Sequence, residues 1–268
     1  MAKAGHENFP VALWLLPADC RRHLLAFYGF ARLVDDIGDD YDGDRLAALS
    51  ALEHDVQRMY LHRPRHPLLK PLQQSVRELG VPKRLLLTLI EANRQDQHVT
   101  RYDTFDDLLG YCRLSANPIG HLVLHAFQAA TPVRIGLADR ICSALQIIEH
   151  LQDVAEDYAR GRVYLPQEDL SRFGCAEDDL ARPAAGGRLR HLIAFECERA
   201  DRLLQAGRPL INTMPRRKAA AIAGYIAGGY AALAAIRRAG YDVLAHPTSP
   251  TRLDLARAFI HTWSRRRE

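Results

Sequence analysis

Apolar residues recur along this chain with the period of an α-helix. In successive segments they fall at positions i, i+3, i+4 and i+7, and the strict alternation typical of a β-strand is nearly absent. The pattern stops at breakers such as Arg63-Pro64, Gly80-Val81-Pro82 and Thr131-Pro132. The sequence therefore predicts an all-α protein, with helices over residues 17–36, 43–62, 66–79, 82–99, 104–112, 115–129, 134–160, 187–212, 215–239 and 250–264.

Length and composition suit one helical domain. The chain has 268 residues and is 48% hydrophobic, which is enough for a sizeable core. The most loop-like segment, RPAAGG at 182–187, is interpreted as a surface loop because it lies inside the helical region. We predict a single domain over 1–268, with a core over about 6–255 and a basic tail over 256–268.

Charge, cysteines and apolar runs indicate which partners and which cellular compartment the protein has. The formal net charge of +4 does not argue for a nucleic-acid partner. No apolar segment typical of a signal peptide precedes the first proline, and the apolar run 219–236 is interrupted by glycines and tyrosines, as in a closely packed core helix. The cysteines lack metal-site or disulfide spacing, so we expect reduced thiols in a cytoplasmic protein: Cys20, Cys112, Cys142, Cys175 and Cys197.

An unusual acidic cluster closes the first predicted helix. The segment ARLVDDIGDD, residues 31–40, places four aspartates within six positions after an apolar and aromatic run. Asp35 and Asp39 share one helix face, and Asp36 and Asp40 share another. Like charges at this spacing destabilise a helix by a few tenths of a kcal/mol, so the cluster needs either a solvated helix end or a bound cation.

A second acidic stripe lies on the helix predicted over 134–160. Gln146, Glu149, Asp153 and Asp157 follow one another at steps of three, four and four, so they share one face of an otherwise apolar helix. Two carboxylate rows that face each other across a helical bundle would bind a hard divalent cation. Mg²⁺ suits such oxygen donors and often bridges them to substrate phosphates. Few histidines accompany the stripes, which argues against zinc or a di-iron centre.

The same residues carry a family resemblance. FYGFARLVDDIGDD resembles the first aspartate-rich motif of the squalene/phytoene synthase family, and QIIEHLQDVAEDYARGRVYLP resembles the second. Three further stretches are similar to one branch of that family, which converts presqualene diphosphate to hydroxysqualene: GHENFPVALWLLP, YCRLSANPIGHLVL and AGGYAALAAIRRAGYDVL. The resemblance implies an isoprenoid synthase fold, a helical bundle with a central cavity.

The resemblance also implies roles for individual residues. Diphosphate would be held by a cluster of roughly two or three Mg²⁺ ions. The implied metal ligands are Asp35, Asp36, Asp39, Glu149, Asp153 and Asp157. The implied substrate-binding or cavity-lining positions are Asn8, Phe9, Tyr28, Arg32, Asp96, Tyr111, Asn117, Gln146, Gln152 and Arg162. Tyr28 is counted with the aspartates among the catalytic residues.

An apolar, dry pocket would suit the carbocation that forms when diphosphate leaves. Aromatic residues early in the chain would either line such a pocket or pack in an ordinary core: Phe9, Trp14, Phe27, Tyr28 and Phe30. No GxGxxG follows a predicted strand, so we expect no NADPH, which favours capture of the cation by water over reduction.

Two positions depart from the family pattern. The second motif usually carries asparagine where this chain has Glu149, which keeps an oxygen ligand but adds a negative charge. Gln152 stands where members that form presqualene diphosphate or phytoene usually carry arginine. The second difference fits a branch with a different reaction.

Two other functions stay open. One is a head-to-head condensing enzyme that makes presqualene diphosphate, squalene or phytoene, and the other is a non-catalytic assembly factor. For the leading function the expected partners are an isoprenoid diphosphate substrate, a presqualene diphosphate synthase and a flavin-dependent reductase. The tail TWSRRRE, residues 262–268, is either a contact with an anionic membrane or a disordered basic end. The expected location is the cytoplasm, with peripheral membrane contact.

Overall fold

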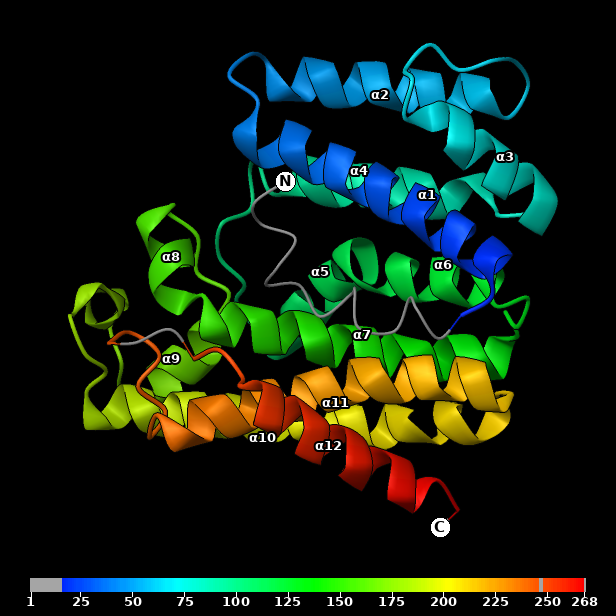
Figure 1. The fold of residues 1–268 in the computed structure, drawn as a ribbon. Helices are drawn as coiled ribbons and strands as arrows, with labels where there is room; N and C mark the ends of the chain where they lie inside the picture. The colour runs from blue at the N-terminus through cyan, green and yellow to red at the C-terminus, as the bar shows by residue number, and fades with distance from the viewer. Residues whose placement is uncertain (1–15, 246–247, 268) are drawn as a thin grey trace. The chain divides into compact units, whose positions relative to one another are not determined.

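The structure is a computed structural model that describes residues 16–245 and 248–267. Within these ranges the chain forms α-helices joined by short turns, 3₁₀ segments and one π-helical turn, with no β-strand (Figure 1). The prediction of an all-α protein is therefore confirmed. The predictions for Asn8, Phe9 and Trp14 lie outside the described residues.

The chain divides into two compact units. The N-terminal unit comprises residues 17–99 and 110–135. The C-terminal unit comprises, within the described ranges, residues 16, 100–109, 136–245 and 248–267. The prediction of a single domain over the whole chain stays a prediction.

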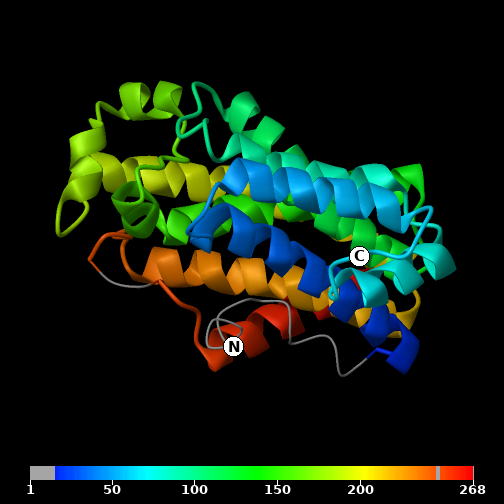
Figure 2. The same cartoon turned by 90° about the horizontal axis from the view of Figure 1, so that it is seen from above.

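The N-terminal unit packs its helices around an aliphatic and aromatic core. Its helices are α1 (Ala18–Asp35), α2 (Arg45–Met59), α3 (Leu69–Leu79), α4 (Lys83–Gln95) and α6 (Asn117–Ala126). The π-helical turn η2 (Asp36–Asp40) leads from α1 towards α2, and these two helices run in opposite directions (Figures 1 and 2). Phe27 and Phe30 are buried in this core, as their ordinary packing role predicts. Other fully buried members are Leu24, Leu49, Met59, Leu72, Leu86, Ile90 and Phe127.

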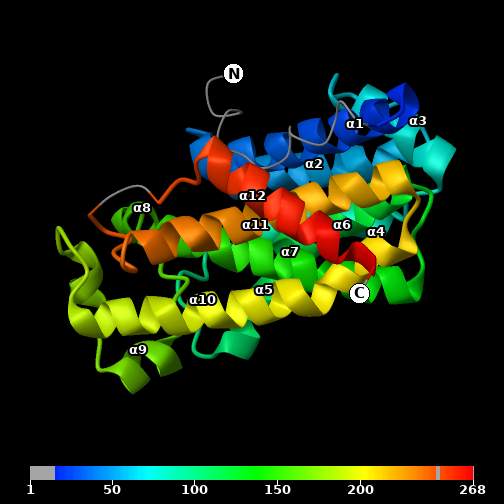
Figure 3. The ribbon, with the colours of Figure 1, turned by 60° about the horizontal axis from the view of Figure 1, so that its bottom comes forward.

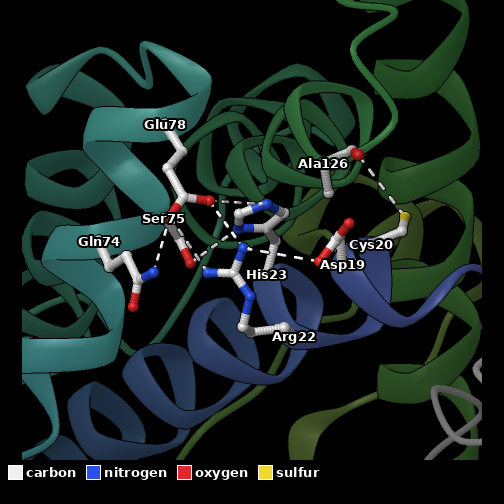
Figure 4. Close-up of polar contacts among 8 residues, drawn as sticks. All are labelled: Asp19, Cys20, Arg22, His23, Gln74, Ser75, Glu78 and Ala126. Atoms are coloured by element: carbon white, nitrogen blue, oxygen red, sulfur yellow. Dashed lines mark hydrogen bonds and ion pairs between the residues drawn. The ribbon is translucent and has the colours of Figure 1, made fainter.

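Polar contacts fix the first turns of α1, which carries the first acidic motif at its other end (Figure 4). Nη2 of Arg22 donates to Oε2 of Glu78 on α3 at 2.7 Å. Nδ1 of His23 lies 3.0 Å from the hydroxyl of Ser75, also on α3. Burial, followed by the charge of Arg22, lowers the pKa of His23, and this shift favours the neutral ring. These contacts bind α1 to α3 at the end of the helix remote from the aspartates.

The C-terminal unit is built on long helices. They are α7 (Pro132–Gln152), α8 (Val154–Ala159), α9 (Gln167–Phe173), α10 (Gly187–Gly207), η4 (Arg208–Thr213), α11 (Arg216–Arg238) and α12 (Arg252–Ser264), together with the start of α5 (Phe105–Ser115). Helices α10, α11 and α12 lie side by side (Figure 3). An added Cβ at Gly229 would lie 2.9 Å from methyl carbons of both Leu145 and Leu204, so the glycine lets α11 approach α7 and α10 closely.

Helix α11 is long and apolar enough to cross a membrane by length and composition alone. In the structure 72% of its most apolar window is buried inside the protein. This agrees with the predicted role of the Ala/Gly-rich run as a core helix.

The cysteines agree with the expectation of reduced thiols. All five lie in the described part of the chain, and none forms a disulfide there. Burial raises the pKa of Cys112 and of Cys197 to about 12. Such thiols remain protonated near neutral pH and behave as small apolar side chains.

Several predicted boundaries need correction. The helix predicted over 134–160 is two helices, because the chain bends at Asp153 between α7 and α8. The helix predicted over 187–212 ends at Gly207 and continues as the 3₁₀ segment η4, where Pro209 cannot donate a helical hydrogen bond. Helix α9 and the 3₁₀ segment Glu177–Ala181 were not predicted, since both are too short to show a clear period.

Candidate active site

The first acidic motif lies where α1 turns into η2. Asp35 is the last residue of α1, and Asp36–Asp40 form the π-helical turn. The side chains of Asp35, Asp36 and Asp39 are exposed, as is that of Asp40. A π-helical turn is rare and often marks a functional site, because it turns side chains away from their ordinary α-helical positions. The carboxylates of this motif are thus available to a cation in solution.

Two amide side chains support this turn, that of Asn93 on α4 and that of Gln97, two residues beyond the end of α4. Nδ2 of Asn93, which is buried, donates to Oδ1 of Asp35 at 3.3 Å. Nε2 of Gln97 donates to the carbonyl of Gly38 at 3.1 Å. An added Cβ at Gly38 would lie 2.0 Å from Oδ1 of Asn93, so only glycine allows this approach. A carboxylate that accepts a hydrogen bond from a buried amide, as Asp35 does from Asn93, keeps a defined orientation towards a bound metal ion.

Asn93 and Gln97 were not identified from the sequence. Their spacing of four residues, which would place both on one face of the helix predicted over 82–99, was the only signal available. Without the fold, nothing indicates that this face supports the first acidic motif.

The other predicted residues of the N-terminal unit lie at three places. Nε of Arg32 lies 3.0 Å from Oδ1 of Asp36, one turn further along the chain, and Tyr28 lies one turn before Arg32 on α1. The hydroxyl of Tyr111 donates to Oδ2 of Asp96 at 2.9 Å, so the structure joins two positions that the sequence named separately. Asn117 is buried in the first turn of α6.

The second acidic motif lies at the bend between α7 and α8. Backbone hydrogen bonds continue through the bend, since the amide of Asp153 donates to the carbonyl of Glu149 at 3.0 Å and the amide of Asp157 donates to that of Asp153 at 2.8 Å. Glu149 and Asp153 are exposed, and Asp157 is partly buried. The acidic stripe is therefore kept, but it follows a kinked path rather than one straight helix.

Electrostatics single out Asp153. Its pKa is raised, first by partial desolvation at the helix end and then by the negative charges of Asp157 and Glu156. A bound cation would relieve this repulsion. The side chain of Gln152 does not join this group of charges, because its amide donates to the carbonyl of Thr248.

His150 holds two residues of the second motif together. Nε2 of His150 lies 3.0 Å from the side-chain amide of Gln146, and Nδ1 lies 3.4 Å from Oδ2 of Asp157. The imidazole also stacks on the ring of Tyr164, with ring centroids 3.6 Å apart. When Nε2 accepts from the amide, Nδ1 carries the proton that points at Asp157. His150 was missed in the sequence, although it lies four residues after Gln146 on the same helix.

A small cavity of about 10 Å³, room for at most one water molecule, lies beneath this group. His150, Asp157 and Arg162 contribute to its lining, and the amide of Arg162 donates to the carbonyl of Asp157 at 2.9 Å. Glu196 also contributes to the lining and is only 1% exposed. Burial raises the pKa of Glu196 to about 8, with Arg199 opposing the change and Asp169 adding to it. This shift favours the neutral acid form of Glu196 near pH 7.

The donor atoms of the two motifs fit Mg²⁺. They are carboxylate oxygens, which hard cations prefer. Among the residues that the structure describes, no three His, Cys, Asp or Glu side chains group closely enough to hold a metal ion by themselves. Mg²⁺ commonly uses one or two protein carboxylates, with water and substrate phosphates completing its shell. That the two acidic rows face each other stays a prediction, since one row belongs to each unit.

Comparisons with known proteins agree with this chemistry. The family model of squalene/phytoene synthase matches residues 2–258. A hydroxysqualene synthase of Rhodopseudomonas palustris is 37% identical over 209 residues, which covers 76% of this chain and 70% of the relative. A phytoene synthase of Mycobacterium tuberculosis is 32% identical over 250 residues, which covers 91% of this chain and 82% of the relative.

The fold of this chain is also similar to that of a solved structure. The squalene synthase HpnC from Alicyclobacillus acidocaldarius superposes with a TM-score of 0.84 at 42% identity, covering 88% of this chain and 90% of that chain. The helical fold and the two carboxylate motifs define an isoprenoid synthase. More particularly, the chain belongs to the squalene/phytoene synthase family.

Proposed function

We propose that this protein converts presqualene diphosphate to hydroxysqualene and releases diphosphate. The observation that carries the proposal is the retention of both acidic motifs in a chain similar to a hydroxysqualene synthase of Rhodopseudomonas palustris and to the squalene synthase HpnC. The bond between carbon and the diphosphate oxygen breaks, and its electron pair leaves with diphosphate. The cyclopropylcarbinyl cation rearranges, water adds to it, and a proton is lost to solvent.

In this proposal the carboxylates bind and orient the leaving group through Mg²⁺. The residues that would hold the ions are Asp35, Asp36, Asp39, Glu149, Asp153 and Asp157. Bound Mg²⁺ would act as a Lewis acid that stabilises the negative charge on departing diphosphate. Asn93 and His150 keep two of these carboxylates in place, through Asp35 and Asp157.

The remaining predicted residues would bind the substrate. Arg32 would pair with a phosphate oxygen and is at present paired with Asp36, so the anion would exchange one partner for another. Side chains that would contact the hydrocarbon or the diphosphate end are Asn8, Phe9, Tyr28, Asp96, Tyr111, Asn117, Gln146, Gln152 and Arg162. Because water is the final nucleophile, the reaction needs no NADPH.

A second function has its own support. The phytoene synthase of Mycobacterium tuberculosis matches 91% of this chain, which favours a head-to-head condensation of two allylic diphosphates. Product analysis separates the two. The purified protein with Mg²⁺ should form hydroxysqualene from presqualene diphosphate and nothing from farnesyl diphosphate. Presqualene diphosphate, squalene or phytoene-type products from allylic diphosphates alone would establish the condensing enzyme instead.

A non-catalytic assembly role is the third alternative. It would fit a member whose metal ligands had been lost, but Asp35, Asp39 and Asp153 are all retained. Glu149 in place of the usual asparagine is the feature that keeps this alternative open. Failure of the protein to bind inorganic diphosphate in the presence of Mg²⁺ would support it.

The reaction implies neighbours in a pathway. Presqualene diphosphate must come from a condensing enzyme, and the alcohol must pass to a reductase, for which a flavin is the expected cofactor. A presqualene diphosphate synthase of Rhodopseudomonas palustris is itself 30% identical to this chain over 214 residues. We propose that the protein works in the cytoplasm beside such enzymes, without a nucleic-acid partner.

A further inference from the structure

A cleft rich in arginine lies on the C-terminal unit, along α12. Its volume is about 830 Å³, and α10, η4, α11 and α12 all contribute to its walls. Its cationic or potentially cationic lining residues are Arg208, Arg237, Arg257, His261 and Arg265. Only two acidic side chains, Asp201 and Asp254, join them. The small residues Ala231, Ala234 and Ala258 leave room between the arginines.

The acidic residues of the cleft already have partners. Asp254 accepts hydrogen bonds from Arg238 at 3.0 and 2.9 Å and also caps α12 through Thr251. Asp201 lies 3.7 Å from Nη2 of Arg237. Within the described ranges, no carboxylate pairs with the guanidinium of Arg257 or of Arg265. The cleft is therefore positively charged and suited to an anion.

The outer face of α12 adds exposed aliphatic side chains to this charge. Leu253 is 56% exposed and Ile260 is 67% exposed. Arg257 lies between them, one turn after Leu253, and all three fall on one helix face. Arg252, the first residue of α12, is also exposed, as is Arg265 in the 3₁₀ segment Arg265–Arg267 that follows the helix. Exposed aliphatic residues among arginines are typical of a helix that lies in the interface of a lipid bilayer.

The combination favours a lipid surface over other anions. A soluble phosphate would satisfy Arg257 and Arg265 but would leave Leu253 and Ile260 in water. A bilayer satisfies both, since its acyl chains accept the aliphatic side chains and its anionic headgroups attract arginines. We propose that the exposed face of α12 docks on an anionic lipid bilayer, with a lipid phosphate in the arginine cleft.

Vesicle sedimentation tests the proposal with the full-length protein. We expect the protein to sediment with vesicles of phosphatidylcholine that contain about 30% phosphatidylglycerol and to stay in solution with pure phosphatidylcholine. Binding should weaken strongly when the salt is raised to about 0.5 M, because salt screens the attraction between arginine and headgroup. Equal binding to both kinds of vesicle would overturn the proposal.

Two double variants separate the contributions of charge and apolar surface. Arg257→Gln with Arg265→Gln should lower the partition onto anionic vesicles about 25-fold, since each arginine at such a surface is worth about fivefold. Leu253→Ser with Ile260→Ser should also weaken binding but should leave its salt dependence in place. None of these four residues is assigned to the reaction, so turnover of soluble substrate should not change.

A matched control uses exposed cations of the other unit. Lys83→Gln with Arg84→Gln, on α4, removes the same charge and should leave vesicle binding as it is in the wild type. An equal loss in the control would mean that net charge alone drives binding, and this would contradict docking through α12. Competition by inorganic phosphate or diphosphate without any vesicle binding would assign the cleft to a free anion instead.

Discussion

Carboxylates at the end of α1 and at the bend after α7 carry the proposed chemistry. Asp35 and Asp153 differ in their surroundings. Asp35 accepts a hydrogen bond from Asn93, whereas Asp153 lies near the negative charges of Asp157 and Glu156. Replacing a carboxylate by the isosteric amide keeps shape and removes the charge that binds Mg²⁺. The role of each carboxylate can thus be tested without changing side-chain volume.

We expect Asp35→Asn, Asp39→Asn and Asp153→Asn each to lower kcat by about a hundredfold or more, because charge stabilisation of the leaving group is lost. Circular dichroism should show an unchanged helix content. Asp40→Asn is the matched control, since Asp40 is exposed in the same turn and has no assigned role. Wild-type turnover in all three variants would contradict the metal-binding role of both motifs.

His150 is a positioning residue in this account, because it acts through Asp157. His150→Phe keeps a ring to stack on Tyr164 but removes the hydrogen bonds to Gln146 and Asp157. We expect this variant to raise the Mg²⁺ concentration for half-maximal activity by about 10- to 100-fold while the melting temperature hardly changes.

A second substitution at His150 tests the contact with Asp157 by restoring it in part. The amide of His150→Asn can still donate towards Asp157 from a position close to that of Nδ1, so it should recover part of the lost Mg²⁺ affinity. Binding of Mn²⁺ with diphosphate, followed by electron paramagnetic resonance, gives a readout that does not depend on turnover. Identical Mn²⁺ affinity in the wild type and His150→Phe would show that His150 does not position a metal ligand.

Glu196 makes stability depend on pH. Its pKa is about 8 in the folded protein, against an ordinary value near 4.5. Between these two values the unfolded chain loses its proton while the folded protein keeps it, so the free energy of unfolding falls as pH rises from about 4.5 to about 8. Above pH 8 the dependence from this residue levels off.

Glu196→Gln removes this ionisation and retains an oxygen that can accept from Arg199. We expect the variant to gain stability relative to the wild type by roughly 1–3 kcal/mol when the pH is raised from 5 to 8. Urea unfolding at the two pH values measures the change. Glu198→Gln, which alters an exposed glutamate on the same helix, should show no such gain. A constant difference at both pH values would contradict burial of an acid at this position.

At the scale of elements, the turn η2 depends on a glycine. An added Cβ at Gly38 would push the amide of Asn93 away from Asp35. We expect Gly38→Ala to lower kcat at least about tenfold through misplacement of the carboxylate. Gly29→Ala is the matched control, because nothing lies within 4 Å of an added Cβ there and alanine favours the helix by up to about 1 kcal/mol. Equal activity of the two variants would show that η2 tolerates the change.

Helical period predicted most long elements, because one apolar face recurs over several turns in each of them. It did not predict the bend at Asp153, because the four-residue hydrogen-bond spacing is kept on both sides of it. The amide of Asp153 donates to the carbonyl of Glu149, and the amide of Asp157 donates to that of Asp153. Short elements such as α9 offer too few residues for a period. The acidic residues themselves were found in the sequence because four aspartates at a helix end are chemically unusual.

Supporting residues were harder to find than charged ones. Asn93, Gln97 and His150 act through hydrogen bonds that depend on how helices pack or bend. Single amide and imidazole side chains on a helix are common and carry no signal of their own. Contacts of this kind follow from the fold and cannot be derived from spacing alone.

At the scale of the whole molecule, each compact unit contributes one acidic motif and its own supports. The first motif rests on α4 within the N-terminal unit, and the second rests on His150 and Tyr164 within the C-terminal unit. The C-terminal unit also carries the proposed lipid-docking face of α12. A protein whose product is a long hydrocarbon alcohol gains from such a face, because the product partitions into a bilayer and not into water.

In the proposed reaction, water captures a cation formed from presqualene diphosphate. To test this, the purified protein is incubated with Mg²⁺ and presqualene diphosphate in water enriched in oxygen-18. The mass of the product is then determined by mass spectrometry. We expect hydroxysqualene that contains one oxygen-18 atom, formed at a rate that falls sharply in Asp35→Asn and Asp153→Asn. A hydrocarbon product, an alcohol without the label or no turnover at all would contradict the proposed reaction.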